Sequence, residues 1–291
     1  MPVAERLACI DIGSNTTRLL VADRRGRRLS WVHQERVFTR IGAELLTGGR
    51  LGPEKIAEVV QVVGGQLASA RAHGTRTVRA VATAAIRGAA DGDALTAAIA
   101  VATGLEVLVL SGGEEARLAF VGVAGTLPEP ADGELGVVDV GGGSSELVVG
   151  RAPDRISWWA SLPVGSAALA AAAADCDPPS PVALEQARAR ISAELAALTV
   201  PRPPMAVAAG GSATSLGRLV GPVLDGASLT RALEVLSTTP AAAVARRYAI
   251  DERRVRLLPA GLLILEAAAR AFGRPLEVGR GGVREGVLLE A

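Results

Sequence analysis

The sequence contains the same acidic, glycine-bearing loop twice. Residues 11–22 read DIGSNTTRLLVA and residues 139–150 read DVGGGSSELVVG, so Asp139 follows Asp11 by 128 residues. Nearly every position matches in kind, and each loop joins two apolar, strand-like runs. We therefore expect a duplicated α/β unit whose two copies face one another across a cleft.

Composition supports two domains and excludes several classes of protein. With 291 residues the chain is long enough for two cores. Aromatic residues make up only 2% and the formal net charge is +1, which argues against base-stacking or globally basic nucleic-acid binders, so no nucleic-acid partner is expected. Lys55 is the single lysine, and no G-x-x-x-x-G-K-[ST] motif occurs, which excludes a P-loop site.

Cysteine and histidine usage excludes further chemistry. Cys9 and Cys176 form no C-x-x-C pair, so neither a disulfide framework nor a zinc knuckle is indicated. His33 and His73 are the only histidines and have no ligand-spaced partners, which argues against zinc hydrolysis and a Ser-His-Asp triad. The longest uncharged run, 156–174, is interrupted by proline and glycine. We expect a soluble, cytoplasmic protein with no signal peptide and no membrane partner.

Hydrophobic periodicity places these loops in two mixed sheets with flanking helices. The first domain is predicted over 1–124, with strands near 6–12, 17–23, 29–40, 77–85 and 105–110 and helices from Pro53 and over 91–103 and 111–123. A polar hinge over 125–134 opens the second domain, predicted over 125–291. Its expected elements are the hairpin 137–150, strands at 156–162 and 205–209, and helices at 166–174, 184–198, 257–272 and the chain's end.

The stretch SGGEEARLAFVGV, residues 111–123, contains two adjacent carboxylates with different expected roles. Ser111 and Glu114 have the spacing of a capping box, which makes Glu114 structural. Glu115 lies about 100° further round the helix and has no evident local partner. It is therefore the candidate general base, placed to orient and deprotonate a water.

Glycine and hydroxyl residues in a tight hairpin leave backbone N–H groups pointing outward, which is the arrangement of an anion nest. An aspartate at the head of such a loop suits phosphate binding when Mg²⁺ lies between carboxylate and phosphate. A third glycine loop opens the helix after the strand at 205–209. The predicted metal ligands are Asp11, Asp139 and Glu146, and the predicted phosphate-binding residues are Gly13, Ser14, Asn15, Thr16, Arg18, Arg87, Gly141, Gly142, Gly143, Ser144, Ser145, Gly211, Ser212 and Arg284.

These motifs resemble the exopolyphosphatase and guanosine pentaphosphate phosphohydrolase family, within the actin-like ATPase and sugar kinase superfamily. The resemblance extends over nearly the full length. It rests on CIDIGSNTTRLLVA (9–22), VATAAIRGAADG (81–92), LSGGEEARLAFVGV (110–123), VVDVGGGSSELVVG (137–150), VAAGGSATSL (207–216) and GVREG (282–286). It implies two duplicated actin-like, ribonuclease H-like domains with the active-site cleft between them.

The resemblance also implies roles for particular residues. The second glutamate of the G-x-E-E-A stretch, Glu115, is the base, and Asp139 with Glu146 helps to hold Mg²⁺ and water. Arg87 and Arg18 face phosphate by analogy. A monovalent cation is a second candidate cofactor, and a homodimer is expected from the resemblance alone.

The implied activity is hydrolysis of the terminal phosphoanhydride of inorganic polyphosphate. Longer family members continue into an extra helical C-terminal domain, so the resemblance is to a short form for which shorter polyphosphates are expected. Guanosine pentaphosphate is the alternative substrate, although no residue constellation for a guanine base is evident. A small-molecule kinase, with adenosine at the third glycine loop, and a non-catalytic nucleotide sensor are less favoured alternatives.

Overall fold

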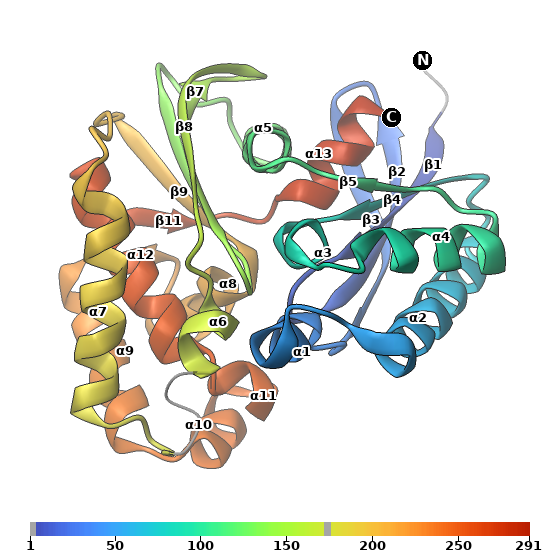
Figure 1. Ribbon diagram of the computed structural model, residues 1–291. Helices are drawn as coiled ribbons and strands as arrows, with labels where there is room; N and C mark the ends of the chain where they lie inside the picture. Colours follow the sequence, from blue (N-terminus) through green and yellow to red (C-terminus); the bar gives the residue numbers. More distant parts are fainter. Residues whose placement is uncertain (1–3, 172–175) are drawn as a thin grey trace. The chain divides into compact units, whose positions relative to one another are not determined.

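The computed structural model describes residues 4–171 and 176–291, and the chain folds as two compact units (Figure 1). The first unit combines Met1–Thr126 with Gly281–Ala291, and the second consists of Leu127–Arg280. No helix in the described part of the chain is long and apolar enough to cross a bilayer.

The first unit is built on a five-stranded mixed sheet in the order β3-β2-β1-β4-β5. Strands β1 to β3 form an antiparallel meander, and β4 and β5 add in parallel to β1. The elements are β1 (Glu5–Ile12), β2 (Thr17–Arg25), β3 (Arg28–Val37), α1 (Ile41–Gly48), α2 (Gly52–Ala72), β4 (Thr77–Ala82), α3 (Ala84–Gly88), α4 (Gly92–Thr103), β5 (Val107–Val109), α5 (Gly112–Ala124) and α13 (Val283–Glu290).

Alternation along β1 gives this sheet two apolar faces. Ala8, Ile10 and Ile12 belong to a core cluster shared with α2 and α4. Leu7 and Cys9 belong to a second cluster, which includes residues of α5 and α13. Because side chains alternate along a strand, Asp11 projects on the same face as Leu7 and Cys9. The first acidic residue is therefore directed to the side of the sheet covered by α5 and α13.

The last helix, α13, packs on α5 through glycines. A Cβ atom on Gly122 would lie 1.9 Å from the carbonyl oxygen of Gly282, and one on Gly286 would lie 2.1 Å from that of Leu118. Only hydrogen side chains allow the backbones to approach this closely. The predicted division at residue 124, with all later residues in the second domain, is therefore corrected, since residues 281–291 return to the first unit.

The second unit repeats the same plan with an added edge strand. Its six-stranded sheet has the order β10-β11-β9-β6-β7-β8, and β6 to β8 form the meander. The elements are β6 (Leu135–Val140), β7 (Ser145–Arg151), β8 (Arg155–Leu162), α6 (Ser166–Ala171), α7 (Pro181–Ala196), β9 (Met205–Ala209), α8 (Gly210–Val220), β10 (Val223–Leu224), α9 (Gly226–Thr238), α10 (Ala241–Tyr248), α11 (Glu252–Val255), α12 (Leu258–Phe272) and β11 (Leu276–Val278).

Strand pairing confirms the duplication expected from the loops. Asp11 lies opposite Arg18 in the first hairpin, and Asp139 lies opposite Glu146 in the second. In each unit the first strand of the meander also pairs in parallel with the next strand along the chain, β4 or β9. The 128-residue repeat in the sequence is thus a repeat of topology and register.

Several local predictions differ from the structure or lie beyond it. The strand predicted over 77–85 ends at Ala82, and the helix α3 begins at Ala84. The strand predicted to reach residue 40 ends at Val37, and the helix α1 that follows was missed. It begins after Arg40, whose left-handed backbone (φ 51°) is uncommon for a residue with a side chain. The predicted helix 166–174 is observed as α6 up to Ala171, and its end lies outside the described residues.

The glycine contact between α5 and α13 predicts a specific sensitivity. We expect Gly286→Ala to lower the free energy of unfolding by about 1–3 kcal/mol, because the added methyl group overlaps the Leu118 carbonyl. The matched control is Gly65→Ala in α2, where a Cβ atom meets nothing within 4 Å. There we expect a gain of about 0.5–1 kcal/mol from helix propensity. Chemical denaturation measures both, and a neutral Gly286→Ala would contradict the close packing.

Candidate functional site

In the first glycine loop the carbonyl groups accept hydrogen bonds, while two adjacent amide groups have no acceptor among the described residues. Between β1 and β2 the Gly13 N–H donates to the Thr16 carbonyl at 3.1 Å, and the Ser14 carbonyl accepts from the Gly42 N–H at 2.7 Å. Within the described residues, the N–H groups of Ser14 and Asn15 donate to no protein acceptor. The turn therefore presents the adjacent donors of an anion nest.

The second loop repeats this arrangement between β6 and β7. The Gly141 N–H donates to the Ser144 carbonyl at 3.0 Å, and the Gly142 carbonyl accepts from the N–H groups of Ala167 and Ala168 in α6. A Cβ atom on Gly165 would lie only 2.4 Å from Gly142, so this turn rests directly on the start of α6. In the part of the chain that the structure describes, the amides of Gly142 and Gly143 have no protein acceptor.

The hydroxyl groups of the loops are mostly enclosed. Ser14, Thr16 and Ser144 are buried, and Ser145 donates to the Val164 carbonyl at 2.7 Å. The Ser145 side chain thus fixes the hairpin to the segment before α6. Backbone amides, more than hydroxyls, are the donors that the two loops offer.

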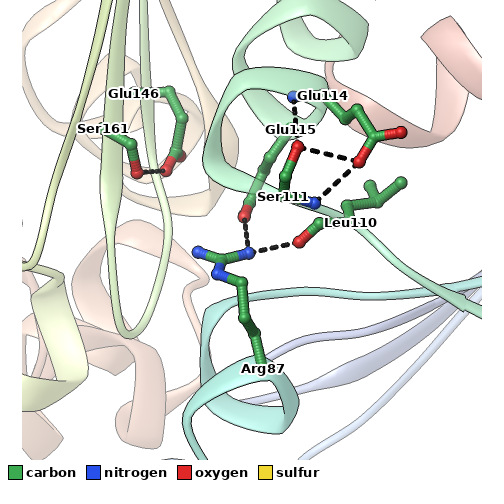
Figure 2. A network of polar contacts seen from close by, with 7 residues as sticks. All are labelled: Arg87, Leu110, Ser111, Glu114, Glu115, Glu146 and Ser161. Atoms are coloured by element: carbon green, nitrogen blue, oxygen red, sulfur yellow. Dashed lines mark hydrogen bonds and ion pairs between the residues drawn. The ribbon is translucent and has the colours of Figure 1, made fainter.

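The residue opposite the loop aspartate differs between the two units. Directly opposed residues on antiparallel strands project to the same face and lie close together. In the first unit the pair is Asp11 with Arg18, which is neutral overall, and in the second it is Asp139 with Glu146, which carries two negative charges when ionised. Glu146 is buried and accepts from the Ser161 hydroxyl at 2.9 Å (Figure 2).

Asp11 lies in a buried charged cluster with the start of α13. Burial raises the pKa of Asp11, while Arg18 and Arg284 act in the opposite direction. Arg284 contacts the Leu19 carbonyl at 3.4 Å and lies 4.0 Å from the carboxylate of Glu285. Among the described residues, Asp11 Oδ1 and Glu285 Oε1 are buried acceptors without a hydrogen-bond partner.

Glu285 was not predicted as a site residue. Its side chain is almost completely buried, and burial raises its pKa against the opposing effect of Arg284. Its neighbour Arg284 was predicted to bind phosphate, but nothing in the local sequence indicated that the GVREG segment returns to β1. Only the long-range packing of α13 on α5 shows it.

Asp139 lies against the N-terminus of α8. A Cβ atom on Gly210 (φ +87°) would lie 2.7 Å from Asp139 Oδ1, so glycine is required both for the backbone conformation and for the close approach. The amide end of a helix stabilises a nearby carboxylate. The third glycine loop therefore supports the acidic residue of the second.

Two other contacts define this third loop. The guanidinium of Arg254 covers Gly211, where a Cβ atom would lie 2.8 Å from its central carbon, and Arg254 itself is buried. Ser212 is fully buried against Gly261 of α12, a location that favours packing over direct phosphate contact. Sequence reasoning missed Arg254, which lies 43 residues after Gly211 in an arginine-rich segment without a recognisable motif.

The start of α5 confirms the predicted capping box. The Ser111 N–H donates to Glu114 at 2.8 Å, and the Glu114 N–H donates to the Ser111 hydroxyl at 3.2 Å (Figure 2). The hydrogen bond from the Ser111 backbone holds the pKa of Glu114 below its ordinary value. The Glu114 side chain therefore caps the N-terminus of α5, as the spacing predicted.

Glu115 has a different environment from the one expected. Its side chain is only 8% exposed, and Oε2 lies 3.3 Å from Nη1 of Arg87, which also donates to the Leu110 carbonyl (Figure 2). Glu115 thus has a partner that is distant in the sequence, which the expectation of no evident local partner did not include. The sequence could not show this partner, because β5 and α4 separate Arg87 from Glu115 along the chain.

The acidic residues suit a partly hydrated magnesium ion. Across the described residues, no group of three or more His, Cys, Asp or Glu side chains could hold a metal ion. Mg²⁺, however, usually keeps several waters and binds to one or two carboxylates together with substrate phosphates. The opposed pair of Asp139 and Glu146 fits that donor set, whereas Asp11 is already matched by two arginines.

Comparison with known proteins decides the family. The profile of the Ppx/GppA phosphatase family matches residues 20–291. The chain belongs to the Ppx/GppA phosphatase family. A relative named exopolyphosphatase 1, from Mycobacterium leprae, is 30% identical over 98% of this chain and 88% of its own length. Exopolyphosphatase 2 from Mycobacterium tuberculosis is 36% identical over 67% of this chain and 64% of its own length.

Solved structures of Ppx/GppA proteins support the fold. The crystal structure of the Aquifex aeolicus family member superposes with a TM-score of 0.83 at 29% identity, covering 99% of this chain and 97% of that one. An exopolyphosphatase from Cytophaga hutchinsonii gives 0.85 at 21% identity, with 98% of each chain covered, and supports the fold alone. The predicted fold class, mixed α/β with two duplicated actin-like units, is confirmed.

The capping box predicts a pH-dependent contribution to stability. We expect Glu114→Ala to cost about 0.3–1.5 kcal/mol at neutral pH, because the Ser111 backbone N–H loses its acceptor. Since the folded-state pKa of Glu114 is lowered, its stabilisation is present above the ordinary value and is lost as the pH falls through the folded value. Denaturation curves from neutral to acidic pH should show the two proteins converging in acid, and a constant difference would contradict this.

Proposed function

We propose that this protein is an exopolyphosphatase, which hydrolyses the terminal phosphoanhydride bond of inorganic polyphosphate with Mg²⁺. The observation that supports this most directly is the repetition of an anion nest in both units, each beside an acidic strand residue. Each nest offers backbone donors that suit a phosphate group, and polyphosphate consists of linked phosphate groups. Membership of the Ppx/GppA family and the names of the mycobacterial relatives favour the same activity.

The nests and arginines would bind and orient the phosphates. We assign backbone donors at Ser14, Asn15, Gly142 and Gly143 to phosphate oxygens, because glycine-containing turns let the anion approach the amides closely. Arg18 lies beside the first nest, on the strand that follows it. Its planar guanidinium suits bidentate contact with a phosphoryl group.

Asp139 and Glu146 are the residues that would hold Mg²⁺. When bound, the ion would neutralise charge on phosphate oxygens and help to align them. Asp11 was predicted as a third ligand, but its position beside Arg18 and Arg284 suits the orientation of those arginines better. A monovalent cation remains a prediction without a site of its own.

Glu115 is proposed as the general base. It would accept a proton from the water that attacks the terminal phosphorus, while the bond between that phosphorus and the bridging oxygen breaks. The products are orthophosphate and a polyphosphate shorter by one unit. A carboxylate buried at the N-terminal turn of α5 is held in one place, which favours such a role.

Guanosine pentaphosphate is the alternative substrate for the same residues. The family name includes this class, yet aromatic residues make up only 2% of the sequence, which does not favour a site that stacks on guanine. A sensor without catalysis would not need Glu115 in a buried ion pair, and a kinase would need an acceptor. The homodimer and the cytoplasmic location remain predictions.

The proposal is tested by phosphate release from polyphosphates of graded length, guanosine pentaphosphate and ATP, each with Mg²⁺. We expect polyphosphate to be cleaved, and the graded series tests the predicted preference for shorter chains. Glu115→Gln should lower kcat by about 10²- to 10⁴-fold, as removal of a general base does. Glu114→Ala, on the same helical turn, is the matched control and should keep the wild-type rate. No release from any polyphosphate would reject the substrate, and an active Glu115→Gln would reject the base.

The proposed metal site predicts a change in metal dependence. Asp139→Asn should raise the Mg²⁺ concentration needed for half-maximal activity by at least about tenfold, because one anionic oxygen of the opposed pair becomes a neutral amide. Asp132→Asn, in the segment before β6, is a control outside the acidic pair. The measurement is a Mg²⁺ titration of phosphate release, and superimposable curves for Asp139→Asn and wild type would contradict the assignment.

A further inference from the structure

One terminal nitrogen of the Arg87 guanidinium, Nη1, is held by two acceptors. Arg87 lies in the last turn of α3, and its Nη1 atom donates both to the Leu110 carbonyl and to Oε2 of Glu115 (Figure 2). Leu110 is the residue just before the capping box of α5, so both acceptors belong to the same short stretch of chain. One nitrogen thus connects α3 with the start of α5.

The rest of the guanidinium is open to a ligand. Within the described residues, Nε and Nη2 of Arg87 make no hydrogen bond or ion pair, and the side chain is 34% exposed. Figure 2 shows the second terminal nitrogen directed away from Glu115 and Leu110. These two N–H groups lie on one edge of a planar group, the geometry that pairs with two oxygens of a phosphoryl group.

Glu115, in contrast, has little freedom of its own. Its side chain is 8% exposed and it lies in the first turns of α5, next to the residue that caps the helix. A guanidinium at 3.3 Å stabilises its negative charge and fixes the direction of the carboxylate. Arg87, which Leu110 holds in place, is therefore one determinant of the orientation of Glu115.

We propose that Arg87 is a bridging positioning residue, which orients Glu115 through Nη1 and binds the attacked phosphoryl group through Nε and Nη2. The proposal rests on the proposed function, since it takes Glu115 as the base. The rigid plane of one guanidinium then sets the position of the base relative to the phosphorus. A lysine cannot orient Glu115 and pair with two phosphoryl oxygens at once, because its ammonium group has a single nitrogen and no planar edge.

A surface ion pair without this role would behave differently. Such pairs contribute little to stability. Loss of one that lies outside the site should leave kcat and KM unchanged. Arg117 with Glu290 is a pair of that kind, and it lies on the same helix as Glu115. Arg117→Met is therefore the matched control for the loss of an arginine ion pair from α5.

The test is a double-mutant cycle of Arg87→Met and Glu115→Gln, with kcat and KM for polyphosphate measured separately and folding checked by thermal unfolding. We expect Arg87→Met to lower kcat by about 10²-fold through misplacement of the base. It should also raise KM by roughly tenfold, through loss of a charged contact. In the double variant, kcat should fall no further than in Glu115→Gln alone, while the rise in KM should persist. Arg117→Met should leave both constants unchanged.

Two further measurements separate positioning from structural damage. Guanidinium ions added to Arg87→Ala should restore part of kcat, whereas Arg87→Lys should restore little, because only the planar ion reproduces both edges. Multiplicative losses of kcat in the double variant, or an Arg87→Lys enzyme as fast as wild type, would overturn the bridging role. If Glu115→Gln itself stays active, the assignment of Glu115 as the base is wrong, and the bridging role of Arg87, which depends on it, is also rejected.

Discussion

The antiparallel pairing at the head of each glycine loop determines where that loop and the charged residues beside it lie. Ile12 pairs with Thr17 in the first hairpin, and Val140 pairs with Ser145 in the second. Each turn therefore contains four residues, 13–16 and 141–144. That pairing places the residue before each turn opposite the residue after it and on one face of the sheet. A register shift of one residue would turn both side chains to the other face. The hydrogen bonds to α1 and α6 then fix the turns from outside the sheet.

The two copies have kept this geometry and diverged in charge. Arg18 occupies in the first unit the position that Glu146 occupies in the second. The first copy thereby places a guanidinium beside its nest and balances its own aspartate, while the second places two carboxyl groups opposite one another. One structural unit, used twice, thus carries a charge-balanced pair in one copy and an acidic pair in the other. The Arg284–Glu285 pair strengthens the balance in the first unit.

Local features were predictable from the sequence, and distant contacts were not. The two loops, the capping box of Ser111 and Glu114, and the strand–glycine–helix junction at Gly210 each depend on residues close together in the chain. The prediction for α13 was wrong because the position of this helix depends on glycine contacts between residues more than 150 positions apart, such as Gly122 and Gly282. The roles of Arg254 and Glu285 were hidden for the same reason, since arginine and glutamate are ordinarily surface residues.

The ion pair of Arg87 and Glu115 is not explained by stability. Glu115 is removed from water, and the cost of removing a charge from water is often not recovered by one ion pair at 3.3 Å. The positive end of α5 and the capped turn beside it lower this cost, yet an apolar residue at 115 would have none. Glu114, one residue earlier, already satisfies the helix end. A second, buried carboxylate at this position, beside an arginine whose other edge makes no hydrogen bond among the described residues, is consistent with the base that we propose.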